Sequence, residues 1–448
     1  MSFRAIFGCL AAAGALLAAP LQRNFAVEHY DVSLQPDLAA KTLTGEVSIR
    51  FHSRIDRLSA LELDVGALEI ASVTDSGVAQ YTERRGALLI VVLGKPLNSD
   101  EQGTIVIRYR APAPKAGATP GGLVFAPGQV YGAFFTSDWM PSSDRPDEPA
   151  TLHLRLSADP RWKVAASGKL SGTTTENGRS VTEWHIDTPT ATYLYAFAAG
   201  DFAESTTQHN KVALRILAPA GMATAPIAEA TGSALQFLAD RTGVAYPLNT
   251  YTQVFVPGDV QQEAVGMSLL PASYGAELAK QPDSLFVLAQ ALAHQWYGVG
   301  LPCADWSDYW LSAGVSTFMA DAFLEKRFGK ARYEKEIERA RGLFESLQSD
   351  GKDRPLSWGD WQTPRQAMGD LPYYKGVVVL DLLRHELGDD VFWRGLHRYT
   401  SQYWGKRVTS DNLEAAMDAA SGKAKSLTKF FERWVTGCCA TLPPGRGH

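Results

Sequence analysis

Apolar side chains return at every second position in the first part of the chain. The alternation is clearest in GEVSIRF (45–51), TIVIRYR (104–110) and TLHLRLS (151–157), and a stretch rich in proline and glycine (111–122) separates the last two runs. A period of two is typical of strands that bury one face and expose the other. We therefore expect an antiparallel all-β domain of the sandwich or saddle type over residues 23–206.

After residue 206 the pattern becomes mixed. KVALRIL (211–217) and YTQVFVP (251–257) predict strands, and the segment between them predicts a helix that reaches Thr242. Further along, helical patterns dominate to the end of the chain. We expect a mixed α/β, mainly helical domain over residues 207–448 and an α+β class for the whole chain.

The most apolar helical pattern covers residues 285–297. Its polar interruptions are Gln290, His294 and Gln295. A helix that is apolar almost all round belongs in a protein core. Gln290 and His294 are four positions apart, so a helix places them on one face, one turn from each other.

A second helical pattern follows Gly314, after a loop that contains Trp306 and Trp310. Its apolar positions have the spacing i, i+3, i+4, i+7 and i+8, and they are Val315, Phe318, Met319, Ala322 and Phe323. Two buried helices joined in this way resemble the frame of a zincin metallopeptidase. In the zincin motif H-E-x-x-H, both histidines bind zinc and the glutamate is the general base.

The segments ALAHQWYG (291–298) and WLSAG (310–314) resemble the H-E-L-A-H-Q-W-x-G and W-L-N-E-G motifs of the membrane alanyl aminopeptidase family of gluzincins. The interval of eighteen residues between His294 and Ala313 also agrees with that family. Three further segments carry the resemblance into the β-rich part: HYDVSL with TGEVSIRF (29–34 and 44–51), WMPSSDRPDEPATLHLRL (139–156) and YLYAFAAGDF (193–202). The resemblance implies an aminopeptidase-type β domain followed by a thermolysin-like peptidase domain.

The resemblance also implies that the zinc site is degenerate. Gln290 stands at the first histidine, Ala291 at the general base and Ala313 at the glutamate ligand, so His294 alone remains of the family's ligands. Zinc needs three or four nitrogen, sulfur or oxygen ligands at about 2.0–2.3 Å. We therefore expect no zinc cofactor here, although active relatives carry one. The alternative role for His294 is a core histidine that is hydrogen-bonded to Gln290 or to a backbone carbonyl.

Two further positions match substrate-binding motifs of the family. Gln262-Glu263-Ala264 resembles part of G-A-M-E-N, whose glutamate binds the free α-amine of the peptide, and this places amine binding on Glu263 with Gln262 beside it. The alternative is a surface glutamate after an edge strand. Tyr373, in YYKG, resembles the tyrosine of Y-x-K-G, which donates a hydrogen bond to the oxyanion of the tetrahedral intermediate.

Composition excludes some classes of partner. The chain has 448 residues, 45% hydrophobic and 20% charged, with a net charge of −5 and no cluster of lysine and arginine. Nucleic acid is therefore not an expected partner.

The first 22 residues predict export. They include one arginine and an alanine- and leucine-rich run, which has the shape of a signal peptide and is short for a membrane span. An uncleaved anchor is the alternative, and no other transmembrane span is expected. The predicted location is periplasmic or secreted.

Removal of the signal would leave three cysteines. An odd number in an exported protein leaves at least one thiol free or in an intermolecular bond. Cys303 is expected to be a small buried apolar residue rather than a replacement ligand. Cys438 and Cys439 are either a soft-metal site or part of an ordinary tail.

Three functions follow from these residues. The first is a catalytically inactive pseudo-peptidase that binds peptides or the amino terminus of a protein partner. The second is a structural or assembly subunit of an envelope complex. The third is an active zinc aminopeptidase with non-standard ligands, which would need donors that the motif does not provide.

Overall fold

The computed structural model describes residues 23–114, 121–361, 364–422 and 427–443. The predicted signal segment, residues 1–22, lies outside this part of the chain and stays a prediction. Among the described residues, no helix combines the length and the apolar character that a membrane crossing requires.

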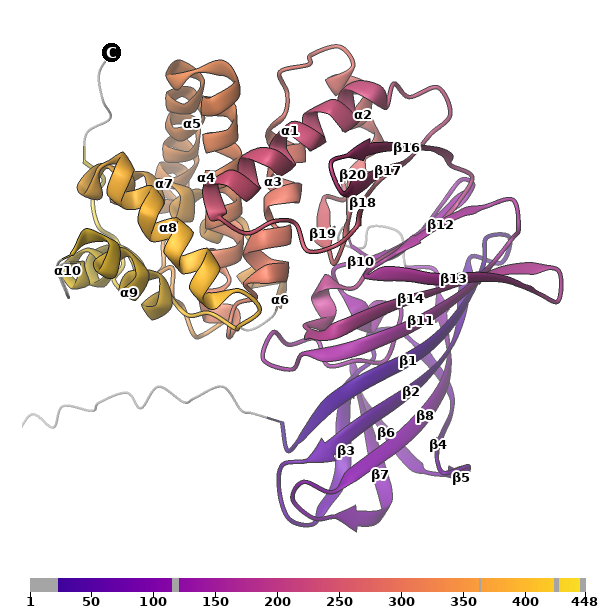
Figure 1. The fold of residues 1–448 in the computed structure, drawn as a ribbon. Helices are drawn as coiled ribbons and strands as arrows, with labels where there is room; N and C mark the ends of the chain where they lie inside the picture. The colour runs from indigo at the N-terminus through magenta and orange to yellow at the C-terminus, as the bar shows by residue number, and fades with distance from the viewer. Residues whose placement is uncertain (1–22, 115–120, 362–363, 423–426, 444–448) are drawn as a thin grey trace, which may run out of the picture.

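The first half of the chain is built from three sheets, which Figure 1 shows at the lower right. The largest has eight strands in the order β13-β14-β11-β1-β2-β8-β4-β5. These strands are β1 (Phe25–Asp37), β2 (Thr42–Ser53), β4 (Glu69–Asp75), β5 (Val78–Ala79), β8 (Gln102–Pro112), β11 (Ala150–Ala158), β13 (Lys169–Glu176) and β14 (Arg179–Thr190). A three-stranded sheet holds β3 (Leu58–Asp64), β7 (Leu88–Leu97) and β6 (Tyr81–Arg85). A four-stranded sheet holds β12 (Lys163–Ala166), β15 (Phe197–Gly200), β10 (Gln129–Ala133) and β9 (Gly122–Ala126).

The alternation in the sequence decides which face of each strand is buried. Along β1, Tyr30, Val32 and Leu34 are buried, whereas Asp31 and Ser33 are exposed. Burying one apolar face against a second sheet is what stabilises a sandwich. The β-sandwich prediction is therefore confirmed.

One strand pair differs from the antiparallel expectation. β1 and β11 run parallel, with His29 opposite Thr151 and Leu34 opposite Leu156. The other pairs of this sheet, among the strands described, are antiparallel. Alternation shows which face of a strand is buried, but the direction of its neighbour depends on how the chain returns to the sheet.

The second half begins with a five-stranded sheet in the order β16-β17-β18-β20-β19. Its strands are β16 (Ala203–His209), β17 (Val212–Ala218), β18 (Thr250–Val256), β19 (Gln262–Ala264) and β20 (Met267–Pro271). The predicted domain boundary after residue 206 falls inside β16, which pairs with β17. β19 lies at the edge of the sheet, next to the helices (Figure 1).

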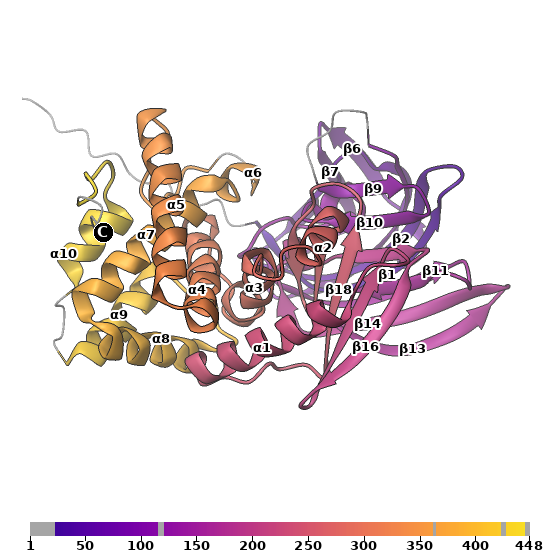
Figure 2. The same ribbon diagram turned by 90° about the horizontal axis from the view of Figure 1, so that it is seen from above.

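Helices make up the rest of the second half, and Figure 2 shows them gathered on one side of the molecule with α2 and α3 between them and the strands. They are α1 (Ala225–Thr242), α2 (Ala272–Leu278), α3 (Phe286–Ala293), α4 (Trp310–Phe328), α5 (Lys330–Ser349), α6 (Pro364–Ala367), α7 (Asp370–Leu387), α8 (Asp389–Tyr403), α9 (Ser410–Ser421) and α10 (Thr428–Phe431). Short 3₁₀ turns are η1 (Thr136–Asp138), η2 (Thr192–Leu194) and η4 (Trp306–Asp308), and π-type turns are η3 (Gln295–Gly300) and η5 (Glu432–Thr436).

The apolar helix predicted over 285–297 is shorter than expected. α3 ends at Ala293, and the chain continues as the π-type turn η3. Gly298 has φ 134°, which favours glycine because a side chain there would be strained. The turn lets the Val299 N–H donate to the carbonyl of His294. His294 therefore lies at the end of the helix.

α4 and α7 approach each other closely enough for their backbones to touch. A Cβ placed on Gly314 would lie 2.8 Å from the Cα of Gly376. The two glycines therefore allow α7 to pack directly on α4. This packing brings Tyr373, in the first turn of α7, beside the residues of α3 and α4.

Candidate functional site

His294 is the centre of a buried hydrogen-bonded cluster. Its side chain is 4% exposed. Nδ1 lies 3.1 Å from the carbonyl oxygen of Tyr297, and since a carbonyl only accepts, Nδ1 carries the hydrogen. Nε2 lies 2.8 Å from Ser316 Oγ and 3.3 Å from Glu263 Oε1. Burial lowers the pKa of His294 to about 3, so the imidazole is neutral and Nε2 is an acceptor.

Glu263 reaches this cluster from the edge strand β19. Its side chain is 7% exposed, and burial raises the pKa of its carboxyl to about 7. The contact with His294 is therefore a hydrogen bond between neutral groups below pH 7 rather than an ion pair. The alternative of a surface glutamate after an edge strand is wrong, because the strand is at the edge but the side chain is buried.

Gln290, at the position of the family's first histidine, is held by other partners than His294. Its Nε2 donates to Thr317 Oγ1 at 2.8 Å, and its Oε1 accepts from Gln261 Nε2 at 2.9 Å. The alternative of a His294–Gln290 hydrogen bond is thus not what the structure shows, whereas the alternative of a backbone carbonyl partner is confirmed.

Ala291 and Ala313 present methyl groups to a packed interior. Both residues are fully buried. The carbonyl of Ala313 accepts a hydrogen bond from Thr317 Oγ1 at 2.7 Å. Ser316 Oγ lies 2.9 Å from the same carbonyl and has one hydrogen, which it donates either to this carbonyl or to His294 Nε2. Ser316 and Thr317 therefore connect the turn of α4 around Ala313 to His294 and Gln290.

Tyr373 closes the cluster from α7. Its ring lies 6.4 Å from the His294 ring in an edge-on arrangement, and its hydroxyl lies 2.9 Å from the hydroxyl of Tyr309. Burial raises the pKa of Tyr373 above its usual value, so its hydroxyl stays protonated. The structure thus brings Glu263 and Tyr373, two positions that match motifs of the family, together with His294.

Gln262 has a different position from the one expected. Neighbouring residues of a strand point to opposite faces, so Gln262 and Glu263 cannot both face the cluster. Gln262 Oε1 accepts from the backbone N–H of Phe134 at 2.8 Å, and its Nε2 donates to the carbonyl of Tyr193 at 2.9 Å. Its amide joins β19 to the β domain and points away from the cluster around His294.

The three cysteines of the described residues take no part in this cluster. Cys303 is a free, buried cysteine whose Sγ lies 3.8 Å from the Tyr193 hydroxyl, and burial raises the pKa of its thiol to about 12. This agrees with the expected buried apolar role. Cys438 and Cys439 form a disulfide with each other.

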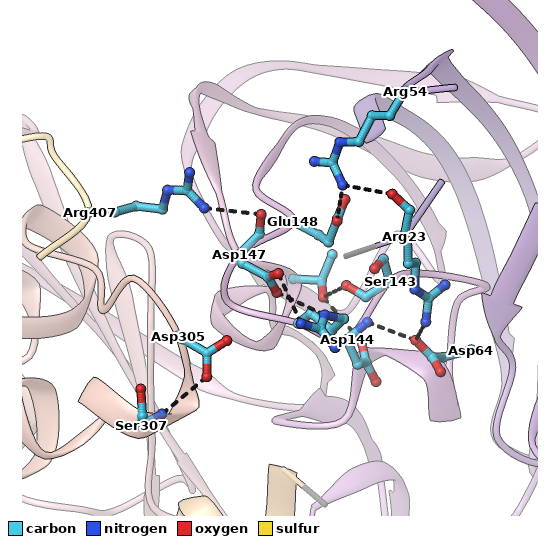
Figure 3. A network of polar contacts seen from close by, with 12 residues as sticks. Arg23, Arg54, Asp64, Ser143, Asp144, Asp147, Glu148, Asp305, Ser307 and Arg407 are labelled. Atoms are coloured by element: carbon cyan, nitrogen blue, oxygen red, sulfur yellow. Dashed lines mark hydrogen bonds and ion pairs between the residues drawn. The ribbon is translucent and has the colours of Figure 1, made fainter. Parts of the chain in front are cut away.

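A second polar network, missed by the sequence reasoning, connects the two halves of the molecule (Figure 3). Asp144 is half-buried, and desolvation of its carboxyl together with nearby Asp64 raises its pKa to about 6. The backbone N–H of Asp144 donates to Asp64 at 3.0 Å, and Arg407, just before α9, donates to the carbonyl of Asp147 at 3.1 Å. The segment DRPDE (144–148) has no motif or spacing from which this contact could have been predicted.

Two family models match the chain: the peptidase M1 N-terminal domain over residues 26–194 and the peptidase family M1 domain over residues 227–434. The chain belongs to peptidase family M1. The aminopeptidase resemblance found in the sequence is confirmed, and so is the order of a β-sandwich domain followed by a helical peptidase-type domain.

Curated relatives of this M1 protein are aminopeptidases of about twice its length. Aminopeptidase 2, mitochondrial, of Saccharomyces cerevisiae is 21% identical over 93% of this chain and 47% of the relative. Endoplasmic reticulum aminopeptidase 1 of Mus musculus is 23% identical over 87% of this chain and 45% of the relative. The M1 protein therefore spans about half the length of the curated relatives it matches.

Solved structures of similar length share the whole fold. The M1 zinc metallopeptidase of Deinococcus radiodurans is 25% identical, with a TM-score of 0.78 over 95% of this chain and 96% of that chain. A mutant of that enzyme bound to a Tyr-Ser-Ala substrate has a TM-score of 0.77 at 25% identity. A two-domain M1 zinc metallopeptidase mutant bound to L-arginine has a TM-score of 0.78.

The buried pair Glu263 and His294 makes opposite contributions to the pH dependence of stability. The His294 pKa is about 3 instead of 6.5, so its contribution is complete above pH 6.5 and is lost as the pH falls toward 3. The Glu263 pKa is about 7 instead of 4.5, so its contribution is complete below pH 4.5 and is lost as the pH rises to 7. Each slope is about 1.4 kcal/mol per pH unit. They cancel between pH 4.5 and 6.5.

We expect the Glu263→Gln variant to show the pH dependence of the free energy of unfolding that His294 alone causes. Relative to the wild type, its free energy of unfolding should rise by about 1.4 kcal/mol per pH unit between pH 4.5 and 6.5. Urea denaturation at three pH values in this window measures the slope. The His294→Gln variant is the matched control and should show a slope of the opposite sign. Parallel curves for all three proteins would contradict the neutral pair.

Proposed function

We propose that this M1 protein is a pseudo-peptidase, which holds no zinc at the family's metal position and binds the amino terminus of a peptide or protein without cleaving it. One observation carries the proposal. The polar side chains at the vestigial site are hydrogen-bonded to one another, and His294 Nε2, the atom that a metal would need, accepts from Ser316 or Glu263.

The donors near His294 do not fit zinc. One imidazole is present where the family has two, the Gln290 amide is occupied at both ends, and Ala313 has no donor atom. Two groups of three histidine, cysteine or acidic side chains in the described part of the chain have a spacing suited to a metal, and neither contains His294. Zinc sites in proteins use three or four ligands. Without a metal-activated water and without a general base at Ala291, peptide hydrolysis lacks both its nucleophile and its proton acceptor.

Glu263 supports the binding part of the proposal. Its carboxyl is buried, and within the described residues it has no lysine or arginine as an ion-pair partner. A buried carboxylate without a counter-charge is unfavourable, so an incoming ammonium group would supply the opposite charge that Glu263 lacks. Aminopeptidase relatives and a substrate complex of a Deinococcus radiodurans mutant support a peptide as the source of that ammonium.

We expect the protein to bind a short fluorescent peptide with a free amino terminus and to bind its acetylated counterpart at least 10-fold more weakly. Glu263→Gln should cause a similar loss, since a neutral amide cannot pair with an ammonium. Glu229→Gln, at a side chain that is 70% exposed, is the control and should leave affinity unchanged. Fluorescence anisotropy measures each affinity, and equal affinity for both peptides would contradict the proposal.

Binding should also depend on pH. Affinity should fall below about pH 7, where the Glu263 carboxyl is protonated. It should also fall above about pH 8, where a peptide α-amine loses its proton. The same samples, tested with aminoacyl chromogenic substrates with and without added zinc, should show no turnover above the level without protein. Turnover that is removed by His294→Ala would contradict the inactive site.

A further inference from the structure

Two histidines and a glutamate lie together on the outer face of the eight-stranded sheet, in the β domain. His153 of β11 is directly opposite His185 of β14, and Asp31 of β1 is opposite His153 on the other side. Glu183 is two positions before His185, so it points to the same face. The imidazole rings of His153 and His185 are stacked, with centroids 4.4 Å apart and an angle of 6°.

The His153 ring is oriented as in a metal site. Asp31 Oδ1 lies 3.1 Å from Nδ1, and a carboxylate at that distance favours the tautomer with the hydrogen on Nδ1 and the lone pair on Nε2. Nε2 is shielded from solvent and has no hydrogen-bond partner among the described residues. The carboxylate–histidine pair is the arrangement that fixes the tautomer of a metal-bound histidine.

Glu183 completes the set of donors. Its Oε1 accepts from Arg155 Nε at 3.2 Å, which leaves Oε2 facing His153 Nε2 at 3.9 Å. That distance is too long for a hydrogen bond, and it is close to the separation of two ligands around one ion. One atom each from His153, Glu183 and His185 lies within 4.8 Å of the others.

We propose that His153, Glu183 and His185 bind a divalent ion of the zinc class, with the Asp31 carboxylate beside Nδ1 of His153. Two imidazoles and one carboxylate suit zinc, copper or nickel better than calcium or magnesium, which prefer oxygen ligands alone. Bonds of about 2.0–2.2 Å require the donors to move by roughly 1 Å, which a turn of one stacked ring would provide. The ion would join β11 to β14, in a different domain from the vestigial site (Figure 1).

The test is zinc titration of the full chain without an affinity tag, after removal of metal with a chelator. We expect calorimetry and metal analysis after dialysis to give one equivalent of bound zinc. His153→Ala and Glu183→Gln should each weaken binding by at least the 10–100-fold that loss of a ligand's hydrogen-bond partner causes, and Asp31→Asn should weaken it by about 10–100-fold. Circular dichroism of each variant establishes that it is folded.

Two histidine variants are matched controls. His397→Ala removes an exposed histidine on α8, and His294→Ala removes the histidine of the vestigial site; both should keep one equivalent of zinc. Absence of saturable binding, or binding that His153→Ala leaves unchanged, would overturn the metal site without affecting the proposed function. Zinc that is kept in His153→Ala but lost in His294→Ala would overturn the metal site and would also contradict the proposed function.

Discussion

The triple variant Gln290→His, Ala291→Glu, Ala313→Glu is expected to bind zinc at the vestigial site and to hydrolyse aminoacyl chromogenic substrates. The three changes restore the family's two missing ligands and its base around His294, which already lies at the end of α3. Tyr373 and Glu263 lie beside it, so the oxyanion and amine contacts proposed for these two residues need no change. Activity should exceed that of the wild type by at least the roughly 10²–10⁴-fold that a general base contributes.

Zinc binding in the triple variant must compete with the present hydrogen bonds. Ser316 and Glu263 have to release His294 Nε2, and Thr317 has to release residue 290. These are single hydrogen bonds worth about 1 kcal/mol each, whereas a structural zinc site contributes about 10 kcal/mol or more. Zinc binding is therefore expected to be more favourable than the hydrogen bonds that it replaces.

The double variant Gln290→His, Ala313→Glu is the matched control for the triple variant. It has the ligands but lacks the base, so we expect zinc at one equivalent with activity about 10²–10⁴-fold below the triple variant. Both are best made with His153→Ala, which keeps zinc at the outer sheet from being counted. A triple variant that holds zinc at this site yet shows no turnover would contradict the idea that the scaffold is otherwise competent.

Asp353→Ala is expected to destabilise the protein by about 3–5 kcal/mol, because it leaves the ammonium of Lys375 buried without a counter-charge. Lys375 follows Tyr373 in α7 and is 2% exposed; its Nζ lies 2.8 Å from Asp353 Oδ1. Burial lowers the pKa of Lys375, and the carboxylate of Asp353 opposes that shift. Urea denaturation at pH 7 measures the loss.

An exposed ion pair in the same loop is the control for Asp353. Asp350 and Lys352 lie 2.9 Å apart, but both are more than half exposed, so Asp350→Ala should cause no measurable loss. The double variant Asp353→Leu, Lys375→Met should recover most of the stability, since it removes both charges. Equal stabilities of Asp353→Ala and Asp350→Ala would contradict the assignment of Lys375 as a buried charge.

Strand and helix types could be predicted because the signal for each is local. The period of two along β1 marks Tyr30, Val32 and Leu34 as the buried face, and the spacing after Gly314 marks the core face of α4. The parallel pairing of β1 with β11 could not be predicted in this way, because either direction of the neighbour buries the same side chains. The early end of α3 could not be predicted either, since the apolar pattern continues past Ala293 to Tyr297, although the regular helix ends at Ala293.

In the candidate site, too, some contacts could be predicted from the sequence and others could not. The partners expected for His294 were Gln290 or a backbone carbonyl, and the structure supplies the carbonyl of Tyr297 together with Ser316 and Glu263. The contact of Ser316 with His294 could have been predicted, because Ser316 is one helical turn after Ala313 and therefore lies on the same face of α4. The proximity of Glu263 to His294 depends on where the edge strand β19 lies against α3, for which the sequence has no local signal.

The sequence by itself determined which atoms are available: family membership follows from its motifs, and the loss of donors at Gln290, Ala291 and Ala313 is a matter of side-chain chemistry alone. Only the tertiary structure decided what those atoms do. It placed His294 and Glu263 in a dry interior where both are neutral at mildly acidic pH, and it brought His153, Glu183 and His185 together across two strands. The physical reason is that hydrogen bonding and burial depend on residues far apart in the chain, and only packing makes these residues neighbours.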